Sequence, residues 1–332
     1  MNRIRKIAFE EHFMAPGFER YSKAFLQFID PAVAADLGRR LADIDELRLD
    51  EMDKAGIDLT ILSQTGPGVQ GEADKAAAIR GAAENNDYLA SRIAKHPTRF
   101  AGFAALAMQD PKAAADELER AVNQLGFKGA LVNGHTQGRY YDDAAYDVVW
   151  ERFQALDVPL YLHPIDFPQI PQTLRDFPVI QGAAWGWGVE TGSHALRLLF
   201  GGVFDRFPKL KVVLGHMGEG LPFQRWRYDS RFAAYPFGVK LARKPSEYIG
   251  SNILITTSGV CSEAALIGAI AEMGPQAVMF SVDYPYESTA TAADFIETAK
   301  LDDATRNLVC HGNAERLFKL APAQQPNHAN AI

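Results

Sequence analysis

The feature that most limits the possible folds is a regular alternation of short apolar runs with longer segments of helical periodicity. The runs are rich in Val, Ile, Leu and Phe, as expected for buried strands. They occupy residues 7–11, 59–64, 100–106, 130–133, 159–163, 212–215, 253–256 and 278–281. Helices are expected between them, at residues 44–55, 73–95, 113–125, 144–156, 191–207, 262–273 and 290–301. Such repeated strand–helix units predict an α/β protein with a parallel sheet.

The number of units favours a closed barrel. Eight strands with intervening helices, in a chain of 332 residues that is 47% hydrophobic, predict a single-domain (β/α)8 barrel of the TIM type. The alternative is an open, doubly wound sheet that binds a dinucleotide. It loses its main support because no GxGxxG motif follows the first strand. We expect one catalytic domain over residues 1–320 and a disordered tail over the polar residues 321–332.

One stretch does not fit a minimal repeat. Residues 164–190 are rich in proline, carry Trp185 and Trp187, and follow the fifth strand. Active sites of barrel enzymes are built from the loops that leave the carboxyl ends of the strands. We therefore expect this long insertion to cover the substrate.

Charge and composition exclude several classes of protein. The net charge is −7 and no basic run is present, which argues against a nucleic-acid partner. No apolar run is long enough to span a membrane, and Glu10, Glu11 and His12 interrupt the first apolar stretch before it reaches the length of a signal peptide. Cys261 and Cys310 are far apart and predict reduced thiols. A cytoplasmic protein is expected.

Ionisable residues gather at the predicted strand ends. Glu10 and His12 are two positions apart, so a strand turns them to the same side, while Glu11 faces elsewhere. His163 ends the fifth strand and Asp283 closely follows the eighth. In a barrel these ends share one rim. Two imidazoles and two carboxylates form a mixed nitrogen and oxygen set that suits zinc, manganese or a similar divalent ion, with positions left open for substrate or water.

With these motifs in place, the sequence resembles the amidohydrolase superfamily. Within it, the chain is similar to the γ-resorcylate, 2,3-dihydroxybenzoate and aminocarboxymuconate-semialdehyde decarboxylases. The resemblance extends from residue 7 to about residue 320. It is carried by residues 9–13 (FEEHF), 129–133 (GALVN), 161–164 (YLHP), 214–222 (LGHMGEGLP) and 280–285 (FSVDYP).

The resemblance assigns roles to individual residues. It implies that one divalent metal is held by four ligands: Glu10, His12, His163 and Asp283. A second metal is not expected, because superfamily members with two metals commonly take a bridging lysine from the fourth strand, which here ends in Asn133. No organic cofactor is implied. The resemblance also suggests a homodimer or homotetramer.

Other residues receive catalytic and binding roles by the same resemblance. Asp283 would protonate the ring carbon that loses CO2. His216 and Glu219 would form an acid/base pair beside the metal, and a turn after the sixth strand can bring these two into contact. Arg227 would bind the substrate, since a guanidinium suits a carboxylate or phenol oxygen.

The predicted function is nonoxidative, metal-dependent decarboxylation of a hydroxylated aromatic acid of the 2-hydroxybenzoate or dihydroxybenzoate type. The protein would thus be a carbon–carbon lyase in aromatic acid catabolism. Decarboxylation needs an electron sink, which a metal can help to provide, and a proton donor at the ring. One alternative is a hydrolase or hydratase on the same barrel, with metal-activated water and His216 as the base. Another is a barrel that only binds a small acid without catalysis.

Overall fold

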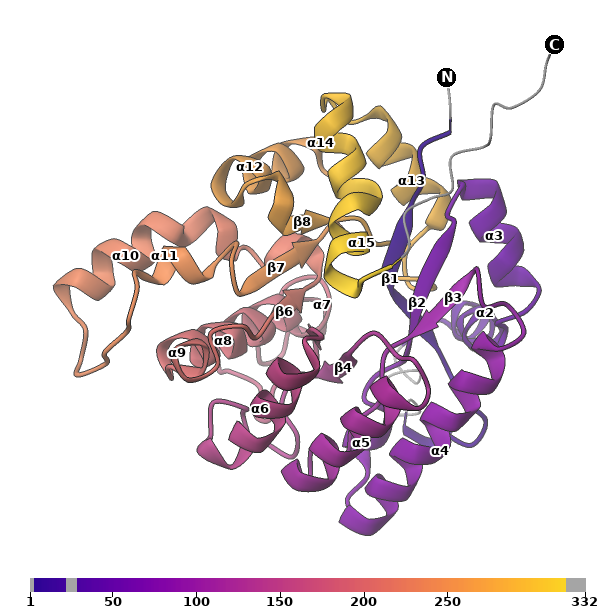
Figure 1. Ribbon diagram of the computed structural model, residues 1–332, viewed down its shortest axis with the longest axis horizontal. Coiled ribbons are helices and arrows are strands. Elements are labelled where there is room, and N and C mark those ends of the chain that lie inside the picture. Colours follow the sequence, from indigo (N-terminus) through magenta and orange to yellow (C-terminus); the bar gives the residue numbers. More distant parts are fainter. Residues whose placement is uncertain (1–2, 22–28, 321–332) are drawn as a thin grey trace.

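The strands lie at the centre of the molecule and the helices surround them (Figure 1). The computed structural model describes residues 3–21 and 29–320. Its strands are β1 (Ile7–Phe13), β2 (Leu59–Gln64), β3 (Phe100–Gly102), β4 (Ala130–Asn133), β5 (Leu160–His163), β6 (Val212–Leu214), β7 (Ile253–Thr256) and β8 (Val278–Met279). All eight predicted strands are present, although β3 and β8 are shorter than expected.

Most helices follow strands. They are α2 (Pro31–Ala42), α3 (Leu47–Ala55), α4 (Lys75–Ile93), α5 (Pro111–Asn123), α6 (Asp147–Leu156), α7 (Pro178–Gln181), α8 (Gly186–Phe200), α9 (Val203–Arg206), α10 (Arg225–Ala234), α11 (Pro245–Tyr248), α12 (Glu263–Met273), α13 (Thr289–Thr298), α14 (Asp303–Asn307) and α15 (Asn313–Phe318). Short turns of other helix types are η1 (Gly68–Gly71), η2 (Ala144–Tyr146), η3 (His216–Gly218), η4 (Leu221–Gln224), η5 (Pro275–Ala277) and η6 (Leu308–Gly312).

The strands are parallel and follow one another in chain order. One ladder joins β1, β2 and β3, and a second joins β4 to β8. Parallel bridges close both seams, between Ala104 and Ala130 and between Glu11 and Tyr284. The predicted TIM barrel is therefore confirmed, and the carboxyl ends of all its strands meet on one rim.

A register shift between Ala8 and Glu11 interrupts the pairing of β1 with β2. Such bulges are common at barrel rims, where they re-aim a side chain. Here Phe9 packs into the barrel interior against Tyr161 and Phe318, with ring centroids 5.9 and 4.9 Å away. Glu10 also turns inward, where it accepts a hydrogen bond from Tyr161. The bulge thus places two consecutive residues inside the barrel.

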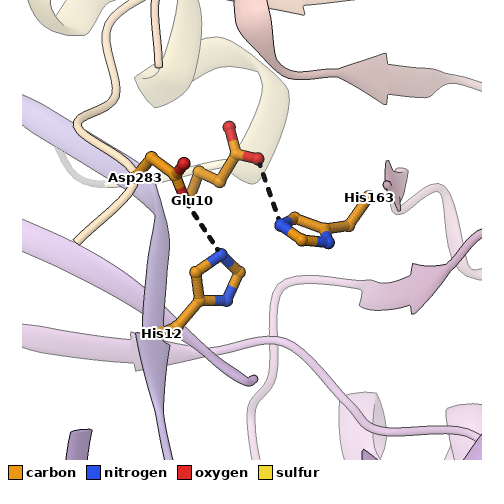
Figure 2. Close-up of side chains that lie close together, drawn as sticks. All are labelled: Glu10, His12, His163 and Asp283. Carbon is orange, nitrogen blue, oxygen red and sulfur yellow. Dashed lines mark ion pairs between the residues drawn. The ribbon is translucent and has the colours of Figure 1, made fainter. Parts of the chain in front are cut away.

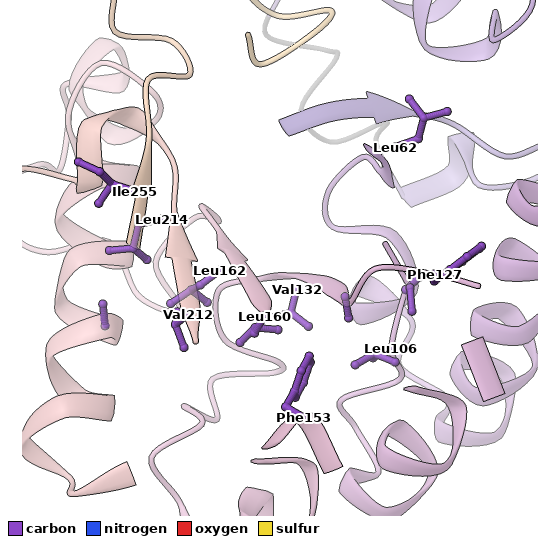
Figure 3. Close-up of a cluster of buried hydrophobic side chains, with 14 of the residues drawn as sticks. Leu62, Leu106, Phe127, Val132, Phe153, Leu160, Leu162, Val212, Leu214 and Ile255 are labelled. Carbon is purple, nitrogen blue, oxygen red and sulfur yellow. The ribbon is translucent and has the colours of Figure 1, made fainter. Parts of the chain in front are cut away.

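The apolar core has two layers. The barrel interior is filled by one cluster, which includes Phe9, Phe103, Tyr161 and, from α15, Phe318. A larger cluster lies between the strands and the surrounding helices, with Leu62, Val132, Leu162, Leu214 and Ile255 on the strands (Figure 3). Adjacent strand residues alternate between the two clusters, as expected for a sheet buried on both faces. Both layers hold the strands rigidly beneath the rim.

The predicted helix 191–207 differs from the structure at both ends. Helix α8 begins at Gly186, five residues earlier, and Gly201 and Gly202 separate it from α9. Gly202 has a φ of 72°, a left-handed conformation that glycine adopts without steric cost and that interrupts a helix. Residues 186–190 of the predicted loop insertion are therefore the first turns of α8, and α7 lies within the rest of it.

The predicted disordered tail, residues 321–332, lies outside the described residues. Among residues 3–21 and 29–320, no helix is both long and apolar enough to cross a bilayer.

Candidate active site

Four polar side chains converge at the rim of the barrel (Figure 2). Glu10 and His12 come from β1, His163 ends β5, and Asp283 follows β8. Each offers one ligand atom, and these atoms all lie within 4.8 Å of one another. Nε2 of His12 is 3.3 Å from Oδ1 of Asp283, and Nε2 of His163 is 3.6 Å from Oε1 of Glu10. The residues that the sequence singled out as metal ligands thus share one small space.

Several atoms that face this space are buried and unpaired. Within the described part of the chain, Oε1 of Glu10, Nε2 of His12 and Oδ1 of Asp283 have no hydrogen-bond partner. Buried polar atoms are nearly always hydrogen-bonded, because leaving them unpaired costs about 1–3 kcal/mol each. A cation at the centre of the group would satisfy all three atoms at once. The donor set therefore fits a divalent metal.

The histidines are oriented as metal ligands are. Nδ1 of His163 lies 3.0 Å from the carbonyl oxygen of Pro164, which can only accept, so this nitrogen carries the proton. Nδ1 of His12 lies 3.1 Å from Oγ of Ser63. A hydrogen bond to the far ring nitrogen fixes the tautomer and leaves a lone pair on Nε2 for the metal. Burial also lowers the pKa of His163 well below its ordinary value, which favours the neutral ring.

Three hydroxyl groups hold the second carboxylate oxygen of Glu10. Oε2 accepts hydrogen bonds from Tyr161 and Ser258, and Oγ1 of Thr256 lies 3.5 Å away. These donors fix the orientation of the carboxylate and leave Oε1 toward the centre of the cluster. Burial raises the pKa of Glu10, although the histidine charges and the Ser258 hydroxyl lower it. A metal ion would add a strong preference for the ionised form.

Asp283 is the more accessible carboxylate of the group. Its side chain is 12% exposed, whereas that of Glu10 is fully buried. Burial raises the pKa of Asp283, but the nearby imidazoles of His12 and His216 lower it to a net value below the ordinary one. This shift favours the ionised carboxylate, the form that binds a metal.

His216 lies beside the cluster and is tied to Glu219. Its Nδ1 atom is 2.8 Å from Oε1 of Glu219, and its Nε2 atom is 3.5 Å from Oδ2 of Asp283. Burial lowers the pKa of His216, but the negative charges of Glu10 and Glu219 outweigh burial and raise it well above the ordinary value. This is the contact that the sequence predicted for the pair.

Helix α8 covers Glu219 closely. A Cβ atom added to Gly188 would come within 2.8 Å of Oε2 of Glu219, and one added to Gly192 would contact its Cβ and backbone oxygen. The absence of side chains at these two positions allows the helix to approach. This role of α8 was not predicted from the sequence, because residues 164–190 were expected to form a loop.

A buried glutamate on the same helix was also missed. Glu190 is 1% exposed. Burial raises its pKa, the nearby Tyr140 hydroxyl lowers it and the charge of Glu219 raises it, to a net value of about 7. His194, one turn later, accepts a hydrogen bond from the backbone of Tyr141 and packs against Tyr140. A buried carboxyl group that titrates near neutrality thus lies close to the His216–Glu219 pair.

Arg227 lies elsewhere. It is an exposed residue of α10, in a surface groove that Tyr228, Phe232 and Phe237 also line. Helix α10 stands out from the barrel (Figure 1). Within the described residues, no hydrogen bond or ion pair links Arg227 to the metal-ligand cluster. The structure therefore does not place it with the other predicted site residues.

Comparisons with known proteins agree with this geometry. The family model described as "Amidohydrolase" matches residues 12–320. A γ-resorcylate decarboxylase of Polaromonas sp. is 45% identical over 324 residues, which cover 95% of this chain and 98% of that protein. A solved 2,6-dihydroxybenzoate decarboxylase in complex with 2,6-dihydroxybenzoate superposes with a TM-score of 0.91 at 42% identity and covers 96% of this chain and 100% of its own.

A second solved relative contains manganese. A dihydroxybenzoic acid decarboxylase from Polaromonas sp. JS666, with bound manganese and the inhibitor 2-nitroresorcinol, superposes with a TM-score of 0.90 at 44% identity. The alignment covers 96% of this chain and 98% of that one.

Proposed function

The chain belongs to the amidohydrolase family, and on that premise we propose that it is a metal-dependent, nonoxidative decarboxylase of a 2-hydroxybenzoate-type acid. One observation carries the proposal: Glu10, His12, His163 and Asp283 aim their ligand atoms into one buried space. Residues 1–320 form the proposed catalytic domain. The protein is a carbon–carbon lyase.

The substrate is proposed from the relatives. γ-Resorcylic acid is 2,6-dihydroxybenzoic acid, and proteins named for its decarboxylation are 42–45% identical to this chain over nearly its whole length. We expect 2,6-dihydroxybenzoate to be the first acid to test. The catalytic unit needs one divalent metal ion, and manganese is proposed because a relative holds it. Held by Glu10, His12, His163 and Asp283, the ion would supply positive charge beside the bound acid and withdraw negative charge from its ring.

Asp283 is the proposed proton donor. Its side chain is 12% exposed and so accessible to a substrate, and its carboxyl group can carry a proton to the ring carbon that bears the carboxylate. When the bond to that carboxylate breaks, CO2 leaves, and the electron pair of the broken bond restores the aromatic ring. The ring carbon thus exchanges CO2 for a proton, with no oxidation.

The His216–Glu219 pair is proposed to resupply the proton. Oδ2 of Asp283 is 3.5 Å from Nε2 of His216, close enough for transfer after a small movement. Glu219 holds the other ring nitrogen and stabilises the charged imidazole. Each turnover consumes one proton, so a charged histidine beside the donor suits a repeated cycle.

We also propose that the protein is a homodimer or homotetramer. Large apolar side chains on and near α10 are exposed, including Trp226 at 78% and Phe237 at 91%. Exposed patches of this kind are typical of protein contacts. Arg227 lies on the same helix, so its proposed role in binding the acid would be fulfilled across a contact between two copies. Light scattering measures the mass in solution and so tests whether the protein is a homodimer or homotetramer.

A cytoplasmic location is proposed from the cysteines. Cys261 and Cys310 are both free thiols. Unpaired cysteines are usual in reducing compartments.

A substrate panel tests the proposed function. The enzyme loaded with manganese is incubated with hydroxybenzoates that differ in ring position and with lactones, and released CO2 and opened lactone are measured. We expect CO2 from acids with a hydroxyl group ortho to the carboxylate and none from 4-hydroxybenzoate. Lactone opening without CO2 release would favour the hydrolase alternative and contradict the proposal.

A further inference from the structure

The proposed metal ligands are joined by the seam between β1 and the segment after β8. The backbone N–H of Asp283 donates to the carbonyl oxygen of Glu10 at 3.0 Å, and the N–H of His12 donates to the carbonyl oxygen of Tyr284 at 2.7 Å. Three of the four ligands therefore belong to one backbone ladder. Any change in the spacing of this ladder alters the distance between the imidazole of His12 and the carboxylate of Asp283.

Arg48, from α3, contacts both sides of this seam. Its side chain is fully buried, and its guanidinium group donates a hydrogen bond to the carbonyl oxygen of His12. The same group lies 4.2 Å from the centroid of the Tyr284 ring. A guanidinium over an aromatic face is attracted to it, most strongly where water is excluded. Arg48 thus links the backbone of one ligand to the residue that follows another.

Glu11 is a buried carboxyl group of the same seam. It points away from the metal-ligand cluster, and its Oε1 atom accepts a hydrogen bond from the N–H of Val282 at 3.0 Å. Burial raises the pKa of Glu11, while the hydrogen bond from Val282 and the charge of Arg48 lower it, to a net value of about 8. The two consecutive glutamates therefore have separate tasks, since Glu10 faces the proposed metal and Glu11 faces the seam.

A buried charge adds little to stability. Removing a charge from water costs several kcal/mol, and apolar residues of similar volume are often as stable. A fully buried arginine that reaches the backbone of a metal ligand therefore points to a role in the geometry of the site. Residues that orient metal ligands typically change metal affinity or activity 10–100-fold when they are replaced.

We propose that Arg48 is a positioning residue that fixes the β1–β8 seam through the His12 carbonyl and the Tyr284 ring, and so sets the geometry of His12 and Asp283 for metal binding. The inference rests on the proposed metal site. It assigns to the Arg48–Tyr284 contact a function that the ligands alone do not provide.

Arg40 offers a matched control. Its guanidinium lies 4.7 Å from the same Tyr284 ring, but it pairs with Glu51 at 2.7 Å and does not bond to His12. The full-length wild type, Arg48→Met, Arg48→Lys and Arg40→Met proteins are stripped with a chelator and titrated with Mn²⁺ by calorimetry. The Tm of each stripped protein, and the kcat and KM of each reloaded protein, are measured alongside.

We expect Arg48→Met to weaken Mn²⁺ binding at least about 10-fold, in the range for residues that orient metal ligands. Under saturating metal its kcat should fall more than its KM rises. Arg48→Lys should recover part of the affinity, and Arg40→Met should bind within about twofold of the wild type on the same scale. If Arg48→Met lowers only the Tm and binds Mn²⁺ like the wild type, Arg48 is merely structural and the inference is overturned.

A second variant covers the case in which Arg48→Met does not fold. Tyr284→Leu keeps the backbone carbonyl that accepts from the N–H of His12 but removes the ring beneath Arg48, and we expect it to weaken Mn²⁺ binding by severalfold. Unchanged binding in a folded Tyr284→Leu protein would overturn the inference. A wild type that binds no metal at all would instead contradict the proposed function.

Discussion

Nδ1 of His216 lies 2.8 Å from Oε1 of Glu219, three positions further along the chain. The contact depends on an unusual turn, in which His216, Met217, Gly218 and Glu219 all have positive φ values, from 49° to 75°. Left-handed residues other than glycine are uncommon, and when they cluster they are often found at functional sites. The turn directs the imidazole toward Asp283 while Glu219 remains buried under α8.

Replacing His216 with asparagine should separate catalysis from metal binding. The residue lies beside the four ligands, so His216→Asn should keep a near-normal metal content. It loses the group that carries the proton, and the rate should fall about 100-fold or more, as is usual for a general acid or base. Elemental analysis and turnover are measured on the same sample. A variant that loses its metal would show that His216 is a ligand and that the acid/base assignment is wrong.

Replacing His163 with alanine should empty the metal site. We expect the wild type to hold about one divalent ion per chain and His163→Ala to hold much less, with no activity, because an open site of four ligands loses a nitrogen donor. Plasma emission spectrometry provides the count. His311→Ala is the control, since His311 pairs with Glu315 outside the cluster and its loss should leave the metal in place. Active enzyme without metal would disprove the assignment.

Glu190 should make the stability of the protein depend on pH. Its pKa is raised from 4.5 to about 7, so the folded state keeps a proton that the unfolded state releases. Its contribution to stability is present below about pH 4.5 and is lost as the pH rises to about 7, by at most about 3 kcal/mol for a shift of this size.

Urea unfolding of the wild type and Glu190→Gln between pH 4 and 8 measures this effect, because the difference between them isolates Glu190 from Tyr140, Glu219 and other titrating groups. We expect the wild type to lose stability relative to the variant as the pH rises. A difference that does not change with pH would mean that Glu190 titrates as it does in water.

The sequence predicted the strands and the convergence of the proposed ligands because both follow from local patterns. Buried strands of a barrel are short apolar runs, and a residue at the end of such a run lies on the rim. Glu10 and His12 were also correctly placed on one side of β1. The bulge that turns Phe9 and Glu10 inward together was not predicted, because it depends on the register with β2 rather than on the residues of β1.

Other features needed the tertiary structure. Helix α10 has no buried residue, so no core-facing side of the helix guided its prediction from the sequence. Helix α8 begins within a segment rich in glycine and tryptophan, and its role emerges only from the contact of Gly188 with Glu219. Arg227 was matched by motif alone, and a motif does not say on which surface a helix places its side chain.

The central claim is that Asp283 delivers the proton that replaces CO2. The most direct measurement follows CO2 release and ring deuteration in deuterated water, with the wild type and Asp283→Asn both loaded with manganese. We predict one deuterium per CO2 in the wild type, at the carbon that lost the carboxylate. Asp283→Asn should keep metal and substrate affinity, because the amide oxygen remains a ligand, but lose turnover about 100-fold or more. An Asp283→Asn enzyme that decarboxylates within about tenfold of the wild-type rate would contradict the account, since the proton would then come from another group.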